Sequence, residues 1–554
     1  MTVGAEDLPG DTQPLLQSFA NNGWRSPQGY SSTDDSASTS SVNSRDGDSS
    51  CETIIVDFNP DGDPENPLDW PTPFRWAIVS MLAFMAFTVT MTCISLVPLA
   101  PEIVRDLSPS TTTSSSSAQG VLLVTIWELG EAAGPLLIAP LSERLGRRPV
   151  FHAAHLLFIL SGILAAMTRS ESNPSSSSSS ASSSAAVTRF ILLRMLSGLA
   201  VAANVLNPAV VGDLFARDER GAPLSLTFLA PLIGGALGPA VGSAIAHKHG
   251  WRAVVWMTVV LAVMGETLFL LGFPETYKPV ILRKKKERLE AAAKAKAEEE
   301  GREVVGVRFK TILEVEADGE GAEKGGASLR DSILRPAIVL FSSGVLMLLS
   351  LYGSVIFSYY YIYSTTYPTI LLEVYKLSPV TVGSCFCVYS VGSALTVVLC
   401  NRFLDRIYRR MSFLHKGVGQ PEFRLPLSIV GALLMPVAVA TYGWAAERQL
   451  PLPVLLLSVF TLGAATMLAL IPVMAYVVDA FGLYAASAMT GVIVSRCLMS
   501  TFLPLTTVPL ISNFGYGWAF TVFAVLSLLL APIPMFMLRY GERWRKFSRY
   551  TREA

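Results

Sequence analysis

Twelve apolar runs, each near the length that a helix needs to cross a bilayer, constrain this chain more than any other feature. A helix requires about 20 apolar residues to span the hydrocarbon core. Six runs precede a long polar insert at 274–334 and six follow it. The sequence therefore predicts an all-α membrane protein with twelve transmembrane helices in two six-helix halves. The predicted spans are 75–97, 119–140, 150–168, 188–212, 222–246, 252–273, 335–357, 379–401, 424–446, 452–474, 482–508 and 514–538.

The composition fits a protein embedded in lipid. Of the 554 residues, 51% are hydrophobic and 16% are charged, whereas soluble domains carry about 25% charged residues. The net charge of zero provides no basic field that would bind nucleic acid. The cysteines form no CxxC pair and the histidines no HExxH motif, so we expect no metal site and no cofactor.

The placement of Lys and Arg predicts the orientation in the membrane, because cytoplasmic loops carry an excess of both. The basic runs "RKKK" (Arg283 to Lys286) and "RWRKFSR" (Arg543 to Arg549) fall on the same predicted side as the N-terminus. We therefore expect both termini in the cytoplasm. The predicted divisions are a disordered N-terminal tail at 1–74, a first half at 75–273, a cytoplasmic loop at 274–334, a second half at 335–538 and a basic C-terminal tail at 539–554.

The N-terminal tail also bears on the choice of membrane. Its stretch "DTQPLL" (Asp11 to Leu16) fits the spacing of an acidic dileucine sorting signal. We expect a monomer in the plasma membrane, with the vacuolar or endosomal membrane as the alternative.

Three motifs follow one another in the order of a known transporter family. They are "APLSERLGRRPV" (Ala139 to Val150) after the second span, "ILLRMLSGLAVA" (Ile191 to Ala202) in the fourth and "GGALGPAVGS" (Gly234 to Ser243) in the fifth. This set resembles the major facilitator superfamily and, within it, the fungal drug:proton antiporters with twelve spans. The resemblance implies inverted repeats within each half, and "LDRIYRRM" (Leu404 to Met411) echoes the loop motif in the second half.

The loop motif predicts a gating latch. Gly146 permits a tight turn, while Arg147 and Arg148 can pair with acidic side chains in one transport state and separate from them in the other. A plain basic anchor at the cytoplasmic face is the alternative. The predicted latch consists of Glu143, Arg144, Gly146, Arg147, Arg148 and Asp213, with Asp405, Arg406 and Arg409 in the second half.

The glycines of the fifth span recur every four residues and therefore share one face of the helix. Gly234, Gly238 and Gly242 allow a close helix contact, and Pro239 removes one backbone hydrogen bond. The family resemblance implies that this rigid kink seals an antiporter against proton leak. Ordinary helix packing is the alternative.

Ionisable residues inside the predicted spans mark an expected proton pathway. Such charges cost about 2.5–3.5 kcal/mol on insertion scales and normally face a cavity or a partner. Glu128 and Arg194 both fall in the outer part of adjacent spans, so we expect Glu128 to pair with Arg194. A static buried ion pair is the alternative. The predicted proton-coupling residues are Glu128, Glu131, Arg194 and Glu266.

The central spans predict the kind of cargo. Aromatic and Met side chains form adaptable apolar walls, and a few hydroxyl and amide groups orient a ligand. An amphipathic or apolar organic compound suits such a lining better than a sugar or an ion. The predicted cavity residues are Asn204, Asn207, Tyr359, Tyr360, Tyr363, Met467 and Arg496.

These features predict a proton-driven exporter of xenobiotics or of a secondary metabolite such as a glycolipid. A proton-coupled importer of a nutrient or organic ion is one alternative, and a transporter-like sensor that moves nothing is another. The sequence contains no nucleophile, base and acid set and no GxxxxGK[ST] loop. We therefore expect neither an enzyme nor a pump powered by ATP.

Overall fold

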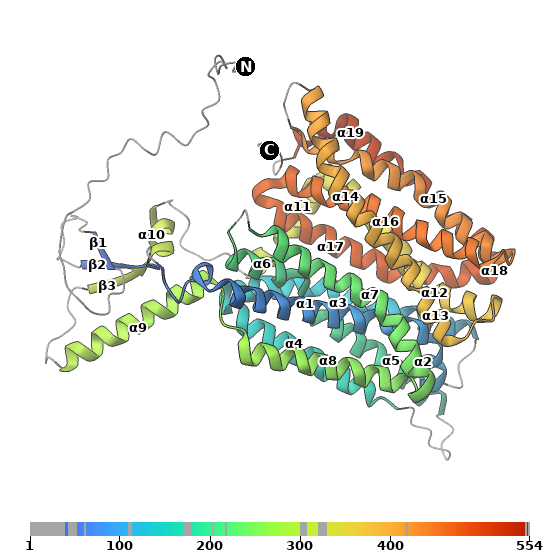
Figure 1. Ribbon diagram of the computed structural model, residues 1–554, viewed down its shortest axis with the longest axis horizontal. Helices are drawn as coiled ribbons and strands as arrows, with labels where there is room; N and C mark the ends of the chain where they lie inside the picture. The colour runs from blue at the N-terminus through green and yellow to red at the C-terminus, as the bar shows by residue number, and fades with distance from the viewer. Residues whose placement is uncertain are drawn as a thin grey trace, which may run out of the picture.

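The helices form two groups that lie side by side, one built from the chain before α9 (Lys278–Glu299) and the other from the chain after α10 (Ile312–Gly319) (Figure 1). The structure is a computed structural model. It describes residues 39–42, 52–59, 62–108, 113–169, 179–201, 203–216, 219–299, 307–319, 329–415, 419–548 and 551. Asp11 to Leu16, the predicted sorting signal, lies outside these ranges.

The first half contains eight helices of the described chain. In this half α1 packs along α7, α3 along α5, and α4 along α8. The short 3-10 helices η1 (Pro67–Asp69) and η2 (Val97–Leu99) flank α1. The helices are α1 (Thr72–Ser95), α2 (Ala100–Leu107), α3 (Thr113–Leu145), α4 (Arg147–Ala166), α5 (Ser179–Leu199), α6 (Ala203–Leu214), α7 (Gly221–His249) and α8 (Trp251–Gly272).

The second half repeats this kind of packing. Here α15 packs against α16 and α18, α14 against α16, and α12 against α17. The helices are α11 (Leu329–Ser342), α12 (Gly344–Thr369), α13 (Pro379–Cys385), α14 (Cys387–Leu414), α15 (Pro426–Glu447), α16 (Leu452–Phe481), α17 (Ala485–Phe502), α18 (Thr507–Leu530) and α19 (Pro532–Arg545). Shorter turns are the π-helix η3 (Ile370–Val374) and the 3-10 helices η4 (Pro421–Arg424), η5 (Gly482–Tyr484) and η6 (Leu503–Thr506).

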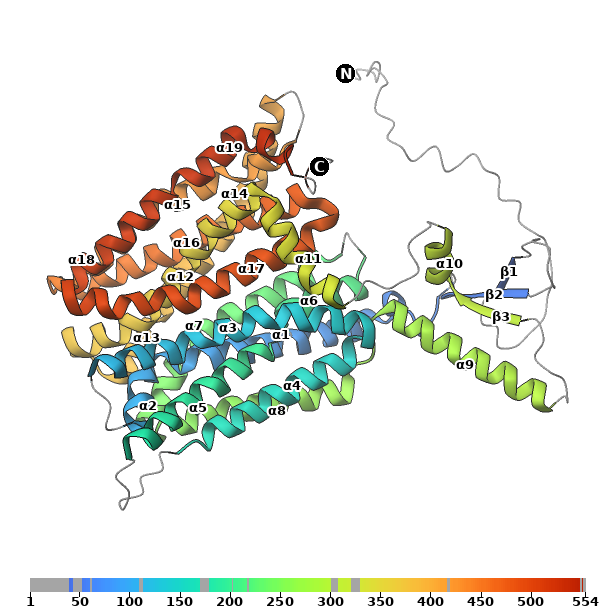
Figure 2. The same ribbon diagram turned by 180° about the vertical axis from the view of Figure 1, so that it is seen from behind.

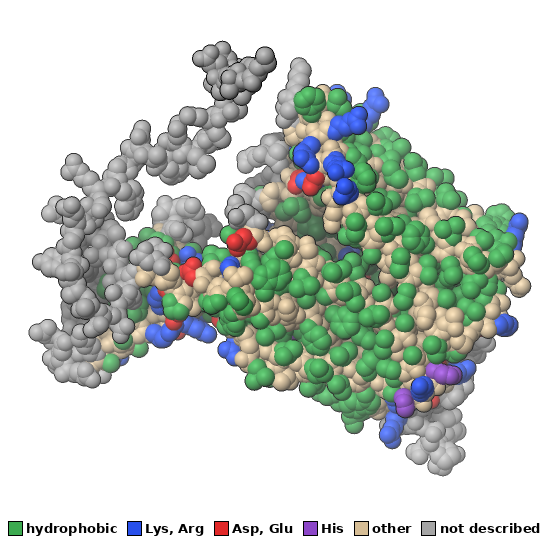
Figure 3. All heavy atoms as spheres, viewed as in Figure 1, with side chains coloured by type: hydrophobic (Ala, Val, Ile, Leu, Met, Phe, Trp, Pro, Cys, Tyr) green, Lys and Arg blue, Asp and Glu red, His purple; other side chains and the backbone are tan. Residues whose placement is uncertain are grey.

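Ten helical stretches of the described chain are long and apolar enough to cross a membrane. One of them, Ala485–Arg545, has 61 residues and is interrupted at Gly515, where φ is 76° and ψ is 176°. Figure 3 shows apolar side chains over the flank of the bundle and Lys and Arg gathered toward its ends. The multi-pass membrane fold is thus confirmed, whereas the count of twelve spans stays a prediction.

The two ends of the bundle differ, and each is named here after a helix found there. At the α9 end, α9 (Lys278–Glu299) projects from the bundle, and both the start of α1 and the end of α19 lie there (Figures 1 and 2). At the α2 end lie α2, α13 and the start of α18. The two chain ends of the helical bundle therefore share one side, as the positive charges predict.

A small appendage lies beside α9. The strand β2 (Glu52–Val56) pairs antiparallel with β1 (Thr39–Val42) and parallel with β3 (Val307–Thr311), which leads into α10 (Ile312–Gly319). The strands β1 and β2 lie within the tail at 1–74 that the sequence predicted to be disordered. The parallel pair β2 and β3 joins segments about 250 residues apart in sequence. Pairing between strands so far apart cannot be predicted from the local sequence of either strand.

Ion pairs hold the N-terminal segment against α9. Lys285 donates to Asp63 at 2.7 Å, and Arg288 pairs with Glu65 at 2.8 Å. Burial alone would raise the pKa of Asp63, but the hydrogen bond from Lys285 and two backbone amides lower it below its usual value. The Asp63 carboxylate therefore stays charged at neutral pH and keeps its contact with α9.

Two predicted boundaries in the second half also differ from the structure. The predicted span 335–357 starts inside α11, because Ser343 caps a separate helix that runs through Thr369. The C-terminal tail predicted from 539 is helical to Arg545, and this buried residue pairs with Glu422 at 2.8 Å. Arg545 therefore forms a specific ion pair with Glu422, besides adding to the positive charge that predicts the orientation.

Candidate functional site

Two buried carboxylates of α3 point from the first half toward the second. The exposed fractions of Glu128 and Glu131 are 2% and 8%. The hydroxyl of Tyr361, on α12, donates a hydrogen bond to Oε1 of Glu128 at 2.5 Å. Oε2 of Glu128 has no hydrogen-bond partner among the described residues. Glu128 therefore links α3 to α12 through one carboxylate oxygen.

The second carboxylate meets a cation of the other half. A guanidinium nitrogen of Arg496, on α17, lies 3.6 Å from Oε1 of Glu131. The same guanidinium lies over the ring of Phe357, 4.2 Å from its centroid. Arg496 was predicted as a cavity residue, and the structure places it in an ion pair that crosses between the halves.

The two helices that carry this ion pair run along each other. Toward the α2 end, the hydroxyl of Thr125 donates to the carbonyl of Thr501 at 3.0 Å, while the hydroxyl of Thr501 donates to the carbonyl of Cys497 in its own helix at 2.8 Å. Thr125, Glu128 and Glu131 follow one another at intervals of three and so share one face of α3. We call this contact of α3 with α12 and α17 the seam.

The predicted pairing of Glu128 with Arg194 is wrong. Both guanidinium ends of Arg194 donate to backbone carbonyls of α1, those of Thr92 at 3.2 Å and Cys93 at 2.9 Å. The guanidinium also lies over the ring of Trp127, 4.6 Å from its centroid. Arg194 therefore faces inward within its own half. The prediction failed because helix spacing gives the depth of a residue in the membrane but not the direction of its side chain.

The close crossing of α3 and α5 places the carboxylates. A Cβ atom on Gly130 would strike the backbone of Met195 and Leu199, and one on Gly198 would strike the carbonyl of Trp127. Only glycine permits this approach, so the two helices meet backbone to backbone. Glu128 and Glu131 flank this crossing on α3 and reach α12 and α17.

Glu266 lies elsewhere, between α8 and α4 inside the first half. Nδ1 of His152 lies 2.7 Å from one carboxylate oxygen of Glu266, and Nδ1 of His155 lies 2.7 Å from the other. Phe151 and Phe269 close around His155. The prediction named Glu266 but missed both histidines, although their interval of three residues would place them on one helix face.

The loop motif forms an ion-paired cluster at the α9 end, which we call the latch after its predicted role. The Nε of Arg147 donates to Asp213 at 3.2 Å, and one terminal nitrogen donates to the hydroxyl of Ser142 at 2.7 Å. Tyr277 stacks under the guanidinium, with its ring centroid 4.5 Å from the central carbon. The pairing of Arg147 with Asp213 is thus the one formed in this conformation, while Glu143, Arg144 and Arg148 are exposed.

Glu275 holds the turn of this latch and was missed by the sequence analysis. Its carboxylate accepts from the backbone amides of Arg147 at 2.8 Å and Arg148 at 3.2 Å, which begin α4. Gly146 adopts φ 99° there, a conformation that side chains with a Cβ rarely adopt. A carboxylate at a helix N-terminus is stabilised by the unpaired amides and the helix dipole.

The second half has a corresponding cluster built on a different arginine. Arg424, on η4, pairs with Asp405 at 2.7 Å and with Asp479 at 2.8 Å. The predicted cations Arg406 and Arg409 are exposed on α14, and Nε of Arg409 donates to the carbonyl of Asp405 at 3.3 Å. The sequence therefore identified Asp405 as the acid of the second-half motif, but the arginine that pairs with it, Arg424, lies on η4 and outside the motif.

The glycine ridge of α7 packs directly on the backbone of α1. A Cβ on Gly234 would lie 2.7 Å from the carbonyl of Phe87, and one on Gly242 would lie 2.6 Å from that of Ser95, with Gly238 between them 3.3 Å from that of Met91. The carbonyl of Pro239 faces Gly383 of α13. The motif is thus both an internal contact and part of the boundary between the halves.

The predicted cavity residues do not all line one site. Tyr360 and Tyr363 belong to an aromatic cluster in which Tyr363 stacks on Tyr389 at a centroid distance of 5.3 Å. Tyr359 packs away from the seam and donates to the carbonyl of Phe523 at 2.7 Å, while Asn207 donates to the carbonyl of Leu82 at 3.3 Å. Met467 is half-buried, and the side chain of Asn204 lies outside the described residues.

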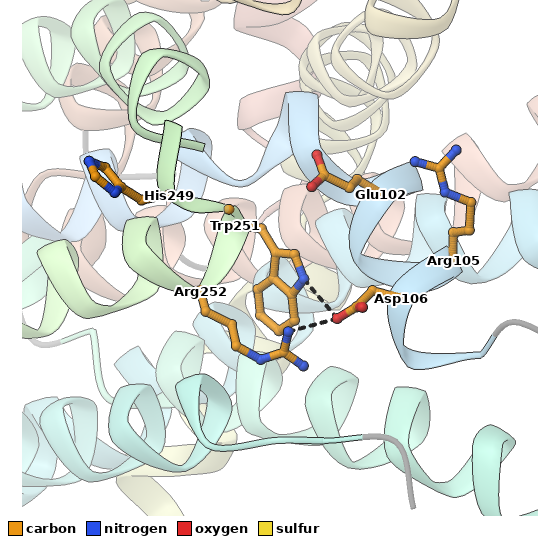
Figure 4. Close-up of a pocket in the computed structure, with 7 residues that line it drawn as sticks. Glu102, Arg105, Asp106, His249, Trp251 and Arg252 are labelled. Atoms are coloured by element: carbon orange, nitrogen blue, oxygen red, sulfur yellow. Dashed lines mark hydrogen bonds and ion pairs between the residues drawn. The ribbon is translucent and has the colours of Figure 1, made fainter. Parts of the chain in front are cut away.

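Two cavities lie at the α2 end. The first, of about 510 Å³, is a polar pocket of the first half in which Asp106 accepts from Trp251 at 3.1 Å and from Arg252 at 2.7 Å (Figure 4). The second, of about 480 Å³, opens between the halves and is lined by α2, α3, α12, η3 and α18. We call this second cavity the outer cavity.

Removing the latch arginine is expected to destabilise the fold. In Arg147→Ala, the carboxylate of Asp213, with a side chain only 19% exposed, loses its counter-ion. Breaking a buried ion pair costs about 3 kcal/mol or more. Thermal unfolding in detergent should show a clear loss for Arg147→Ala and little change for the exposed neighbour in Arg148→Ala. Equal melting temperatures for the two variants would argue against the latch.

Relatives of this chain are fungal transporters. The MFS transporter cpaT of Aspergillus oryzae is 28% identical over 489 residues, which cover 88% of this chain and 91% of that protein. The efflux pump radE of Floropilus chiversii is 28% identical over 498 residues, covering 90% and 86% of the two chains. The MFS-type efflux pump MFS2 of Trichophyton rubrum is 27% identical over 508 residues, covering 91% and 78%.

Solved structures share the fold at lower identity. The partially occluded, inward-open xylose transporter XylE from E. coli aligns with a TM-score of 0.61 and 19% identity, covering 85% of this chain and 98% of that one. The human organic anion transporter MFSD10 aligns with a TM-score of 0.54 and 18% identity, covering 84% and 100%. The Major Facilitator Superfamily model matches residues 77–504. The helical architecture, the loop latch and this match establish that the chain belongs to the Major Facilitator Superfamily.

Proposed function

We propose that the protein is a proton-driven exporter of amphipathic or apolar organic compounds, working by alternating access. One observation carries the proposal: the two buried carboxylates of α3 both contact polar groups of the other half, Glu128 through Tyr361 and Glu131 through Arg496. A carboxylate that takes a proton loses its charge and, with it, the attraction of a nearby cation. Proton binding at the seam therefore changes how strongly the halves hold together.

Coupling follows from this linkage. A proton shifts the equilibrium between two conformations only if it binds one of them more tightly. In the conformation seen here, a nitrogen of Arg496 lies 3.6 Å from the carboxylate of Glu131, and separation of α3 from α17 would remove this attraction. The carboxylates would then load a proton when the seam opens and release it when the seam closes.

The twelve-span arrangement with inverted repeats belongs to this proposal. The helical stretch Ala485–Arg545 is interrupted at Gly515, and in this proposal the parts before and after that residue count as two crossings. The pair α5 and α6 lies between α4 and α7 in the chain and packs against α3 and α4, in the place of a further crossing. An even number of crossings puts the two chain ends on one side, which we propose is the cytoplasm, in the plasma membrane.

The lining supports an organic cargo. The aromatic cluster beside the seam offers ring faces, and the hydroxyl of Tyr363 is buried without a partner among the described residues. An unpaired buried hydroxyl is costly unless a ligand or water completes it. The relatives that are named efflux pumps favour export over import, and we extend that direction to this chain.

Flux in proteoliposomes tests the proposal. The purified chain is reconstituted with an internal pH dye, and candidate metabolites or dyes are offered under an imposed proton gradient. We expect cargo to move against the proton flow and to stop when an ionophore collapses the gradient. Movement of cargo together with protons would show an importer instead, and ligand binding without any flux would show a sensor.

A further inference from the structure

We propose that the outer cavity is a cargo subsite that favours organic cations bearing apolar rings, with Glu373 as the residue that sets this preference. The inference rests on the proposed transport function for its biological meaning, but it concerns binding and can be tested without any gradient. The outer cavity is not lined by Glu128, Glu131, Tyr361 or Arg496 of the seam, nor by any residue of the latch.

Both halves build the outer cavity. The first half supplies Val97 and Pro101 beside α2 and Val121 and Val124 from α3, whereas the second supplies Thr366 from α12 and Ile511 from α18. Its volume of about 480 Å³ lies within the range of about 300–1,000 Å³ common for sites that bind drug-sized ligands. A cavity shared by two moving halves is present only while they hold this arrangement.

The charge of the lining points to a cation. Among the residues that line the outer cavity, Glu373 is the one that carries a formal charge, and the structure describes no ion pair for it. It lies on the π-helix η3, and such turns occur often at functional sites. Glu373 is exposed, so its carboxylate is accessible to a cation that enters the outer cavity from solution, and the two opposite charges attract one another.

Two cations of the protein near this end have partners outside the outer cavity. Arg252 pairs with Asp106 in the neighbouring pocket, and Arg448 lies over the ring of Trp444. Tyr516, at the edge of the outer cavity, adds an aromatic ring on which a cationic group can lie. The carboxylates of the seam do not compete for the same ligand, because Tyr361 and Arg496 already contact them.

The charge preference of the outer cavity is tested with two probes that have the same shape and opposite charges. Tetraphenylphosphonium and tetraphenylborate each present four phenyl rings, and equilibrium binding of both is measured on the full chain in detergent. We expect the wild-type protein to bind the cation at least tenfold more tightly than the anion. In Glu373→Gln, affinity for the cation should fall about tenfold and the preference should largely disappear.

Two further variants separate the subsite from other effects. Glu102→Gln removes a carboxylate at the same end that lines the neighbouring pocket instead (Figure 4), and it should bind both probes as the wild type does. Gly120→Leu fills the outer cavity from α3, where an added Cβ meets no atom within 4 Å, and it should weaken the binding of both probes. Unchanged binding of the cation in Glu373→Gln, or no binding of it by the wild type, would overturn the inference.

These results are independent of the test of transport. A charge preference that depends on Glu373, found in a chain whose cargo flux ignores the proton gradient, would keep the subsite and reject the proton-driven exporter. Coupled export together with a Glu373→Gln variant that binds the cation normally would do the reverse.

Discussion

Replacing Glu131 with Gln is expected to lower proton-driven efflux at least tenfold while the protein still folds. Gln keeps the size of the side chain but cannot ionise, so its contact with Arg496 no longer depends on a proton. The same reasoning applies to Glu128→Gln, in which the amide can still accept from Tyr361. Initial rates of cargo and proton movement in proteoliposomes measure the effect, and melting temperatures in detergent check the fold.

The matched control for these two variants is Glu266→Gln. This carboxylate is equally buried, but it contacts His152 and His155 within the first half and does not reach the seam. If coupling lies at the seam, Glu266→Gln should keep the ratio of protons to cargo even where its rate falls. Loss of coupling in Glu266→Gln alone, with normal coupling in both α3 variants, would move the proton site to the histidine cluster.

The features that sequence predicted well are those that follow from composition and from local motifs. Long apolar runs specify membrane helices, since every backbone polar group must be satisfied within the helix. The turn at Gly146 and the pairing of Arg147 with Asp213 were likewise predictable, because a short motif fixes one partner and the end of a neighbouring span supplies the other. Burial of Glu128 and Glu131 followed from their position within an apolar run.

What sequence could not supply is the direction in which buried side chains point. Glu128 and Arg194 were assigned similar depths, yet the rotation of α3 turns Glu128 toward Tyr361 and leaves Arg194 against the carbonyls of α1. Glu275 was overlooked for a similar reason. Its role depends on backbone amides at the start of α4, more than 120 residues away in the chain.

The close crossing of α3 and α5 leads to the second large effect, on folding itself. We expect Gly130→Leu to yield little folded protein, because its Cβ would overlap the backbone of Met195 and Leu199. Backbone atoms cannot rotate away as a side chain can, so α3 would have to move off α5. Forced overpacking costs about 1–3 kcal/mol even where side chains can adjust, and total stabilities are only about 5–15 kcal/mol.

Gly120→Leu is the matched control for this prediction, since it makes the same substitution ten residues earlier in α3. An added Cβ there meets no atom within 4 Å, so this variant should fold with a melting temperature near that of the wild type. Size-exclusion chromatography of fluorescently tagged protein and thermal unfolding in detergent report both outcomes. A stable, monodisperse Gly130→Leu would mean that the two helices do not approach this closely. The seam could not then owe its position to that glycine contact, and the orientation of Glu128 and Glu131 would need another cause.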